Sequence, residues 1–167
     1  MANDITTIGQ ISYPTIFKAG EEIDPTTQYK GYSVELLVDA IPENLQAAID
    51  RAVNDKFGHD EKLKKKALAS MSCIKKGTDP NDDDREVYRL RFKHRTDFGA
   101  PVVIGPQLQQ LEEGDVYGGC MGRVKFRAYA WQNVNGVGVG LGFSAVQKTG
   151  EGETFASSDD LGGFDAV

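Results

Sequence analysis

Alternation of apolar and polar positions predicts β-strands over much of this chain. Residues 29–38 alternate with a period of two, which places one set of side chains on a common face: Tyr32, Val34, Leu36 and Val38. The same pattern recurs in three later segments, at residues 86–95, 121–131 and 137–146. Several short strands of this kind predict a small barrel or sandwich and disfavour a parallel α/β fold.

Between the strands, the hydrophobic period changes to that of a helix. Apolar residues recur every four positions, at Ile41, Leu45, Ile49, Val53 and Phe57. Pro42 suits the first position of a helix and Gly58 its end. Residues 60–70 predict a second helix or a continuation, whereas the turn-forming residues of 75–84 predict a surface loop. Residues 42–70 are therefore expected to be a helical insertion in a mainly β domain.

Acidic residues concentrate at the C-terminal end of the chain. The protein has 167 residues and a net charge of −6, and residues 151–167 contain acids, glycines and serines but no Lys or Arg. We expect one folded domain over residues 1–150 and a disordered acidic tail over 151–167. Five residues of this tail would bind a partner protein or occupy a basic groove in place of DNA: Asp159, Asp160, Leu161, Phe164 and Asp165.

The apolar runs, the N-terminal residues and the cysteines predict where in the cell the protein is found. No apolar run reaches the ~18 residues of a membrane helix. The N-terminus lacks the basic and apolar order of a signal peptide. Cys73 and Cys120 are too few for a secreted disulfide framework, so a cytoplasmic protein with free thiols is expected.

Two of the predicted strands carry a row of cations on the face opposite their apolar residues. In one strand the row is Arg89, Arg91, Lys93 and Arg95, and in the other it is Arg123, Lys125 and Arg127, followed by Tyr129 and Trp131. Like charges directly opposed on a sheet repel by up to about 1 kcal/mol, so folding does not favour such faces. A polyanion would relieve the repulsion and release counterions. A merely solvated basic face is the alternative interpretation.

The hairpin that joins the last two strands is predicted to place glycines beside the aromatic residues. Asn135-Gly136 is typical of a two-residue type I′ turn. That turn would set Trp131 opposite Gly140, Tyr129 opposite Gly142 and Arg127 opposite Ser144. Bases could stack on this open platform at ~1–3 kcal/mol each. Alternatively, the aromatic rings only shield the glycines.

Taken together, the chain resembles the bacteriophage single-stranded-DNA-binding proteins with an oligonucleotide/oligosaccharide-binding (OB) fold. The matching stretches are residues 11–17, 32–37, 116–120 and 140–148, and the acidic end also fits. The resemblance implies a five-stranded barrel that binds single-stranded DNA without reading its sequence. It also implies a role in phage DNA replication or recombination in the host cytoplasm, with replication or recombination proteins as tail partners. No enzymatic activity and no cofactor are expected.

The same residues allow other assignments. A phage structural or assembly protein that does not bind DNA is the main alternative, and a metal-dependent nuclease using the acids between Asp79 and Glu86 is the less favoured one. A zinc site would need four ligands, and the candidates are His59, Cys73, His94 and Cys120. These residues are widely spaced in the sequence, so no metal is expected. A rival DNA contact is the lysine run of the second predicted helix, Lys62, Lys64, Lys65 and Lys66, although a solvated helix face is the commoner explanation of such a run.

Overall fold

The computed structural model describes residues 5–24, 29–69, 71–95 and 99–152, except for the side chains of 5–8, 13, 15, 17–24, 29, 30 and 95. The predicted acidic tail from residue 153 onward therefore lies outside the described residues. The elements in chain order are β1 (Ile5–Asp24), β2 (Tyr29–Val38), α1 (Glu43–Phe57), α2 (Glu61–Ala69), β3 (Ile74–Asp79), β4 (Asp82–Arg95), β5 (Val102–Ile104), β6 (Met121–Asn133) and β7 (Gly136–Gly150).

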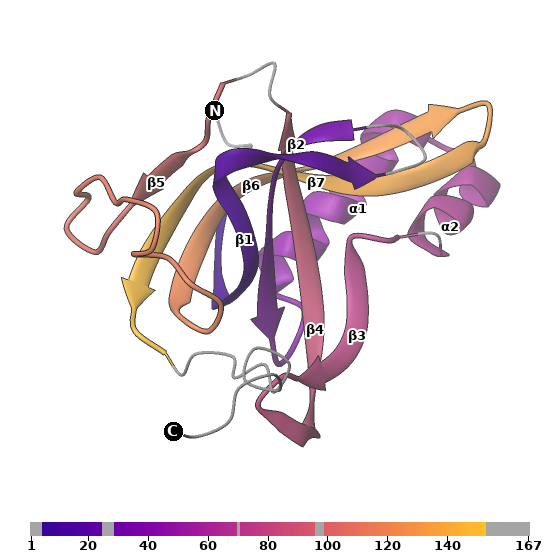
Figure 1. Cartoon of the computed structure of the whole chain (residues 1–167). Coiled ribbons are helices and arrows are strands. Elements are labelled where there is room, and N and C mark those ends of the chain that lie inside the picture. The colour runs from indigo at the N-terminus through magenta and orange to yellow at the C-terminus, as the bar shows by residue number, and fades with distance from the viewer. Residues whose placement is uncertain (1–4, 25–28, 70, 96–98, 153–167) are drawn as a thin grey trace, which may run out of the picture.

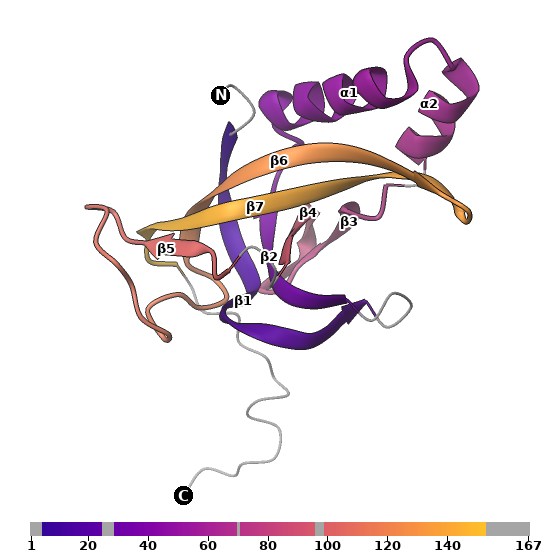
Figure 2. The same ribbon diagram turned by 90° about the horizontal axis from the view of Figure 1, so that it is seen from above.

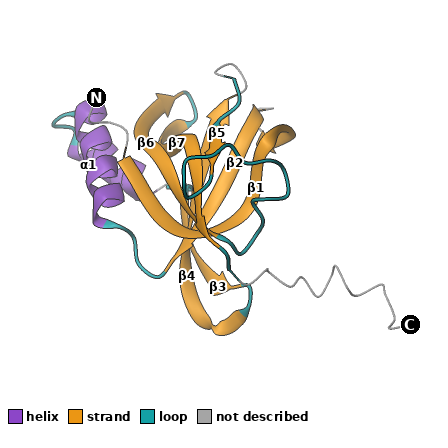
Figure 3. Ribbon diagram, turned by 90° about the vertical axis from the view of Figure 1, so that its left-hand side faces the viewer, coloured by secondary structure: helices purple, strands orange, loops and turns teal. Residues whose placement is uncertain are grey.

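The strands form one sheet that closes into a barrel. Their order is β3-β4-β2-β1-β6-β7-β5, and an additional pairing joins β4 to β7. This closing pairing is parallel and brings Lys93 beside Gly142. Five strands, in the order β1-β2-β4-β7-β6, thus form the ring, while β3 extends it beside β4 and β5 pairs with β7 (Figures 1 and 3). The predicted five-stranded barrel is confirmed.

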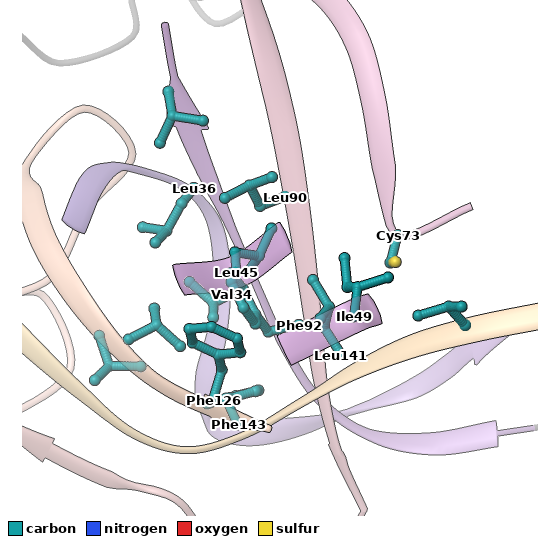
Figure 4. Close-up of a cluster of buried hydrophobic side chains, with 14 of the residues drawn as sticks. Val34, Leu36, Leu45, Ile49, Cys73, Leu90, Phe92, Phe126, Leu141 and Phe143 are labelled. Atoms are coloured by element: carbon teal, nitrogen blue, oxygen red, sulfur yellow. The ribbon is translucent and has the colours of Figure 1, made fainter. Parts of the chain in front are cut away.

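Apolar side chains from alternating strand positions fill the barrel (Figure 4). The rings of Phe92 and Phe126 pack in a tilted arrangement with centroids 5.6 Å apart. Leu36 and Leu90, which are opposed in the β2–β4 register, are fully buried in the same core cluster. Burial of these positions confirms the faces that the alternation predicts, because successive side chains on a strand point to opposite sides.

The helical insertion packs against the far part of the β6–β7 hairpin (Figure 2). Helix α1 buries Leu45, Ile49, Val53 and Phe57, the period-four residues of the sequence. These side chains join the core cluster that also contains Val137, Val139 and Leu141 of β7. The insertion therefore covers the inner face of a hairpin arm that would otherwise expose apolar residues. Within the described residues, no helix is long and apolar enough to cross a membrane.

The ends of α1 follow the expected capping chemistry with one shift. Pro42 occupies the N-cap position, with φ −61° and ψ 141°, so the helix begins one residue later at Glu43. Gly58 ends the helix with φ 57° and donates its N–H to the carbonyl of Asn54 at 2.8 Å. Glycine is favoured there because the left-handed conformation carries no side-chain penalty.

Residues 75–84 are not a surface loop, contrary to the sequence prediction. They belong mostly to the β3–β4 hairpin, whose strands leave only Pro80 and Asn81 between them. Asp79 is buried because Arg85 Nη1 pairs with its carboxylate at 2.6 Å, and Arg85 Nε also donates to Asp39 at 3.0 Å. These ion pairs fix the hairpin against the end of β2. The turn-forming residues mark the turn of this hairpin, and the strands pair on both sides of it, out to Ile74 and Leu90.

Candidate nucleic-acid interface

The outer face of β6 carries the predicted cations and aromatic residues. Burial alternates strictly along the first half of the strand, so that Val124 and Phe126 point into the core while the cations of the opposite parity are exposed: Arg123, Lys125 and Arg127. Further along the same face, the side chains of Tyr129 and Trp131 are 41% and 38% exposed. The predicted face is therefore correct.

The predicted register of the hairpin is wrong by two residues. Asn133 pairs with Gly136, so the connecting residues are Val134 and Asn135. Neither has a positive φ, which a type I′ turn requires, whereas Gly136 has φ 141°. The side-chain Oδ1 of Asn133 accepts the N–H of Asn135 at 2.8 Å and holds this turn. This shift of two residues preserves the faces of residues 126–133 but changes their partners, and a register irregularity between Lys125 and Phe126 reduces the shift farther along β6.

In the observed register, the two aromatic rings each cover a glycine. Trp131 is opposite Gly138, and a Cβ at Gly138 would lie 2.6 Å from Cε2 of the indole. Tyr129 is opposite Gly140, where a Cβ would lie 2.7 Å from the ring carbon Cε2. The rings thus lie against the backbone of these glycines, and Tyr129 and Trp131 remain 41% and 38% exposed. The two rings therefore do shield the glycines, and part of their surface still remains open to a ligand.

The next position of this row joins three strands. Arg127 of β6 is opposite Gly142 of β7, and Gly142 also pairs with Lys93 of β4. Directly paired residues point to the same side of a sheet, so the three positions share the outer face. Neighbouring strands are about 4.8 Å apart, and Lys93 and Arg127 lie two strands apart with Gly142 between them. Their backbones are therefore roughly 10 Å apart. The structure therefore brings together Lys93, Arg127, Tyr129 and Trp131.

The remaining cations of β4 extend away from this centre. Arg89 is half-buried, and its Nη1 lies 3.4 Å from Oε2 of Glu35. Arg91 is opposite Glu35 in the β2–β4 register, and Arg95 is opposite Gly31. The side chain of Arg95 is outside the described residues. One carboxylate therefore interrupts the basic row, because β2 contributes Glu35 to the same outer face.

Arg123 and Lys125 lie on the part of β6 farther from the hairpin turn. They are opposite Ile8 and Thr6 of β1, and opposite Gln147 and Ala145 of β7. No described carboxylate lies within 4.0 Å of Arg123 or Arg127. The exposed cations of β6 therefore continue past Arg127 to Arg123, away from the aromatic residues.

Sequence reasoning missed two residues of this surface. Lys75 of β3 is opposite Arg89 and is exposed, so it adds a cation beside the β4 row. Glu35 adds the carboxylate described above. Applying strand parity to residues 74–79 would have placed Lys75. The position of Glu35 depends on which strands pair, and no local pattern reveals that.

The rival lysine run lies on the other side of the hairpin arm. Helix α2 packs against β7 and buries Ala67 in the same core as Val137 and Val139. Lys64 pairs with Glu61 at 3.0 Å and donates to Asn54 at 3.2 Å. Its neighbours Lys62, Lys65 and Lys66 are exposed. Because the helix covers the inner face, these lysines do not share the surface of Tyr129 and Trp131.

A polar cluster holds the last described residues against the barrel. The Tyr117 hydroxyl donates to Glu151, and Lys148 Nζ pairs with the same carboxylate at 2.6 Å. Lys148 and then Tyr117 lower the pKa of Glu151 through these hydrogen bonds, while the bond to Glu151 raises the pKa of Tyr117. Gly152 also donates its N–H to the Tyr117 oxygen at 3.2 Å. The chain therefore leaves the body at a fixed point, although the tail residues Asp159, Asp160, Leu161, Phe164 and Asp165 are outside the described residues.

The two cysteines are buried thiols, and the described acids gather in no metal-binding group. Cys73 and Cys120 are free and buried. Burial raises the pKa of the Cys73 thiol to about 11 and also raises the pKa of Cys120. Such thiols remain protonated near neutral pH and react slowly. In the described part of the chain, no group of three or more His, Cys, Asp or Glu residues could hold a metal ion.

Comparison with solved structures finds the same fold in phage proteins. The single-stranded-DNA-binding protein of bacteriophage Enc34, in complex with ssDNA, aligns with a TM-score of 0.61 at 22% identity, over 93% of this chain and 90% of that one. Its C-terminal truncation gives a TM-score of 0.60 at 22% identity, over 92% and 88%. The bacteriophage T7 single-stranded-DNA-binding protein gp2.5 gives 0.55 at 15% identity, over 98% and 96%.

The likeness to these structures confirms the OB-type barrel that the resemblance implied. The curated protein sequences contain no significant match to the chain. A family model, described as the ssDNA-binding protein of Enterobacter phage Enc34, matches residues 4–162. Because this match spans almost the whole chain, the protein belongs to the Enc34 family of phage single-stranded-DNA-binding proteins.

Proposed function

We propose that this protein binds single-stranded DNA without sequence readout, on the outer face shared by β4, β6 and β7. The observation that carries the proposal is the pair of rings, Tyr129 and Trp131, resting on glycines directly beside Arg127. Every base has a π-face, so stacking on such rings tolerates any sequence at ~1–3 kcal/mol per base. The cations supply the phosphate contacts that fix the strand.

The position of these residues in the barrel supports the assignment. OB barrels bind oligonucleotides on the face of their second and third strands and on the loop between the fourth and fifth. In this ring those elements are β2 and β4, and the β6–β7 hairpin. Lys93 lies on β4 and the two rings on that hairpin, so the cations and aromatic residues occupy the two parts of such a binding face.

We further propose the full set of contacting residues. Cations that follow the phosphates are Arg89, Arg91, Lys93, Arg95, Arg123, Lys125 and Arg127, with Lys75 added by the fold. Arg89 contributes less than the others because Glu35 already neutralises part of its charge. A protein that covers exposed single strands serves phage DNA replication or recombination in the host cytoplasm. The acidic tail is proposed to contact the proteins of those processes.

Titration with a poly-dT oligonucleotide tests the proposal, with the fluorescence of Trp131 as the readout. Trp131 is the sole tryptophan of the chain, so its emission reports this surface alone. We expect strong quenching that weakens as salt increases, and little response to duplex DNA of the same length. Unchanged emission together with no gel shift at low salt would reject DNA binding. Self-assembly, expected of a phage structural protein, would then be measured.

A further inference from the structure

Gly142 differs from the two glycines that precede it in the outward row of β7. At Gly138 and Gly140, an added Cβ would meet the ring of Trp131 or Tyr129 at 2.6–2.7 Å or less. At Gly142, the nearest atoms would be the carbonyl oxygens of Lys93 at 3.6 Å and Arg127 at 3.9 Å. These are ordinary contact distances, and the backbone there does not adopt a positive φ. The fold therefore has room for a Cβ at residue 142.

Because Gly142 has no side chain, the surface of the sheet between two cationic residues is formed by backbone alone. Lys93 and Arg127 pair with Gly142 from the two neighbouring strands. The ring atom Cε1 of Tyr129 lies 4.0 Å from the position of the absent Cβ. A ligand that enters over Gly142 would thus meet backbone below, a cationic residue on each side and an aromatic ring next to it.

We propose that Gly142 is a positioning residue for the nucleic acid, which lets a phosphate of the bound strand approach the sheet between Lys93 and Arg127. This inference rests on the proposed single-stranded-DNA binding and assigns the place where the strand crosses β7. Glycine at such a site allows close approach of another backbone. A phosphate there would be within reach of both cations while its adjoining base stacks on Tyr129.

Barrel closure is the competing explanation for this glycine. Gly142 is the residue at which β7 pairs with β4, and glycine often marks a bend in a barrel strand. Closure would require glycine if a Cβ collided with β4 or if φ were positive. The Cβ would instead sit 3.6 Å from the Lys93 carbonyl, so closure does not require it.

Two substitutions on the full chain test the proposal, Gly142→Ala and Gly142→Val. Gly150→Ala is the matched control, because it adds a Cβ to the same strand in open space. Affinity for poly-dT is measured at several salt concentrations below the melting temperature of each variant. We expect Gly142→Val to weaken binding about tenfold, which equals 1.4 kcal/mol. The slope of log affinity against log salt should fall by ~0.7 for each lost phosphate contact, and Gly142→Ala should have a smaller effect in the same direction.

Combination with Arg127→Ala separates positioning from a general effect on the fold. If Gly142 positions a phosphate for Arg127, then Gly142→Val should cost less affinity when Arg127 is already alanine. Equal losses in both backgrounds, or unchanged affinity and salt slope in Gly142→Val, would overturn the inference. In those cases the wild-type chain still binds poly-dT and the proposed function stands. Absence of binding by the wild-type chain would reject both.

Discussion

Trp131 lies on Gly138, with its indole ring where any side chain at residue 138 would have to be. A Cβ at Gly138 would lie 2.6 Å from Cε2 and 3.0 Å from Nε1 of the indole. The backbone of β7 therefore supports the ring, while helix α1 supports the hairpin from the inner side. A ring held in this way loses little conformational entropy when a base stacks on it, which favours binding.

Gly138→Val should displace the indole without unfolding the protein. Trp131 is 38% exposed, so its ring can swing toward solvent, and valine is favoured in strands. We expect a loss of less than about 1 kcal/mol in the free energy of unfolding, a red-shifted emission of Trp131 and weaker quenching by poly-dT. Urea denaturation and fluorescence measure these quantities. An unchanged emission spectrum would show that the indole does not depend on Gly138.

Arg127→Ala should weaken binding to single-stranded DNA while the fold remains intact. Arg127 is exposed and adjoins both Gly142 and the aromatic pair, so its loss should remove the phosphate contact that we propose at the centre of the surface. We expect about a tenfold lower affinity and a salt slope reduced by ~0.7. The matched control is Lys62→Ala, which removes an exposed cation from α2 on the other side of the arm. Equal losses in the two variants would mean that net charge, and not this surface, determines affinity.

Deletion of residues 153–167 should tighten DNA binding. If the acids of this segment compete with DNA for the basic surface, removing them raises the local positive potential. We expect an affinity gain on the order of fivefold at low salt, shrinking as salt increases. Ending the chain at Gly152 retains Glu151, whose contacts with Tyr117 and Lys148 belong to the barrel. Equal or weaker binding by the truncated chain would refute the competition.

Acidification should release residues 151–152 from Tyr117. The hydrogen bonds from Lys148 and Tyr117 hold the pKa of Glu151 below its ordinary value. This contribution is therefore fully present above the ordinary pKa of a glutamate and is lost as pH falls through the lower pKa of the folded state. Amide exchange at Gly152, whose N–H bonds the Tyr117 oxygen at 3.2 Å, measures the release. Glu151→Gln should show the same low protection factor at Gly152 at every pH, and protection that persists in that variant would contradict the role of the carboxylate.

Several parts of the fold could be predicted from the sequence because they depend on neighbouring residues. Alternation in β2 and β6 identified their buried faces, and the four-residue period from Leu45 to Phe57 identified α1. These periods follow directly from the geometry of strands and helices. For the same reason, the face that carries Arg127, Tyr129 and Trp131 was correct even though its register was not.

The register of the hairpin shows the limit of local patterns. Asn135-Gly136 favours a type I′ turn, yet the hydrogen bond between Asn133 and Asn135 moves the turn by one residue and the pairings from Phe126 to Asn133 by two. Both registers bury the same face, so the hydrophobic pattern cannot distinguish them. The glycine that lies beside Arg127 follows from this choice.

By itself, the sequence determined the mainly β class, the helical insertion and the outward row of cations and aromatic residues on β6. Tertiary structure alone decided which of these residues meet. Closure of β4 onto β7 set Lys93 beside Gly142, and pairing of β2 with β4 brought Glu35 to Arg89. The physical reason is that side-chain direction is a local property of the backbone, whereas strand pairing depends on how distant apolar faces fill one common core.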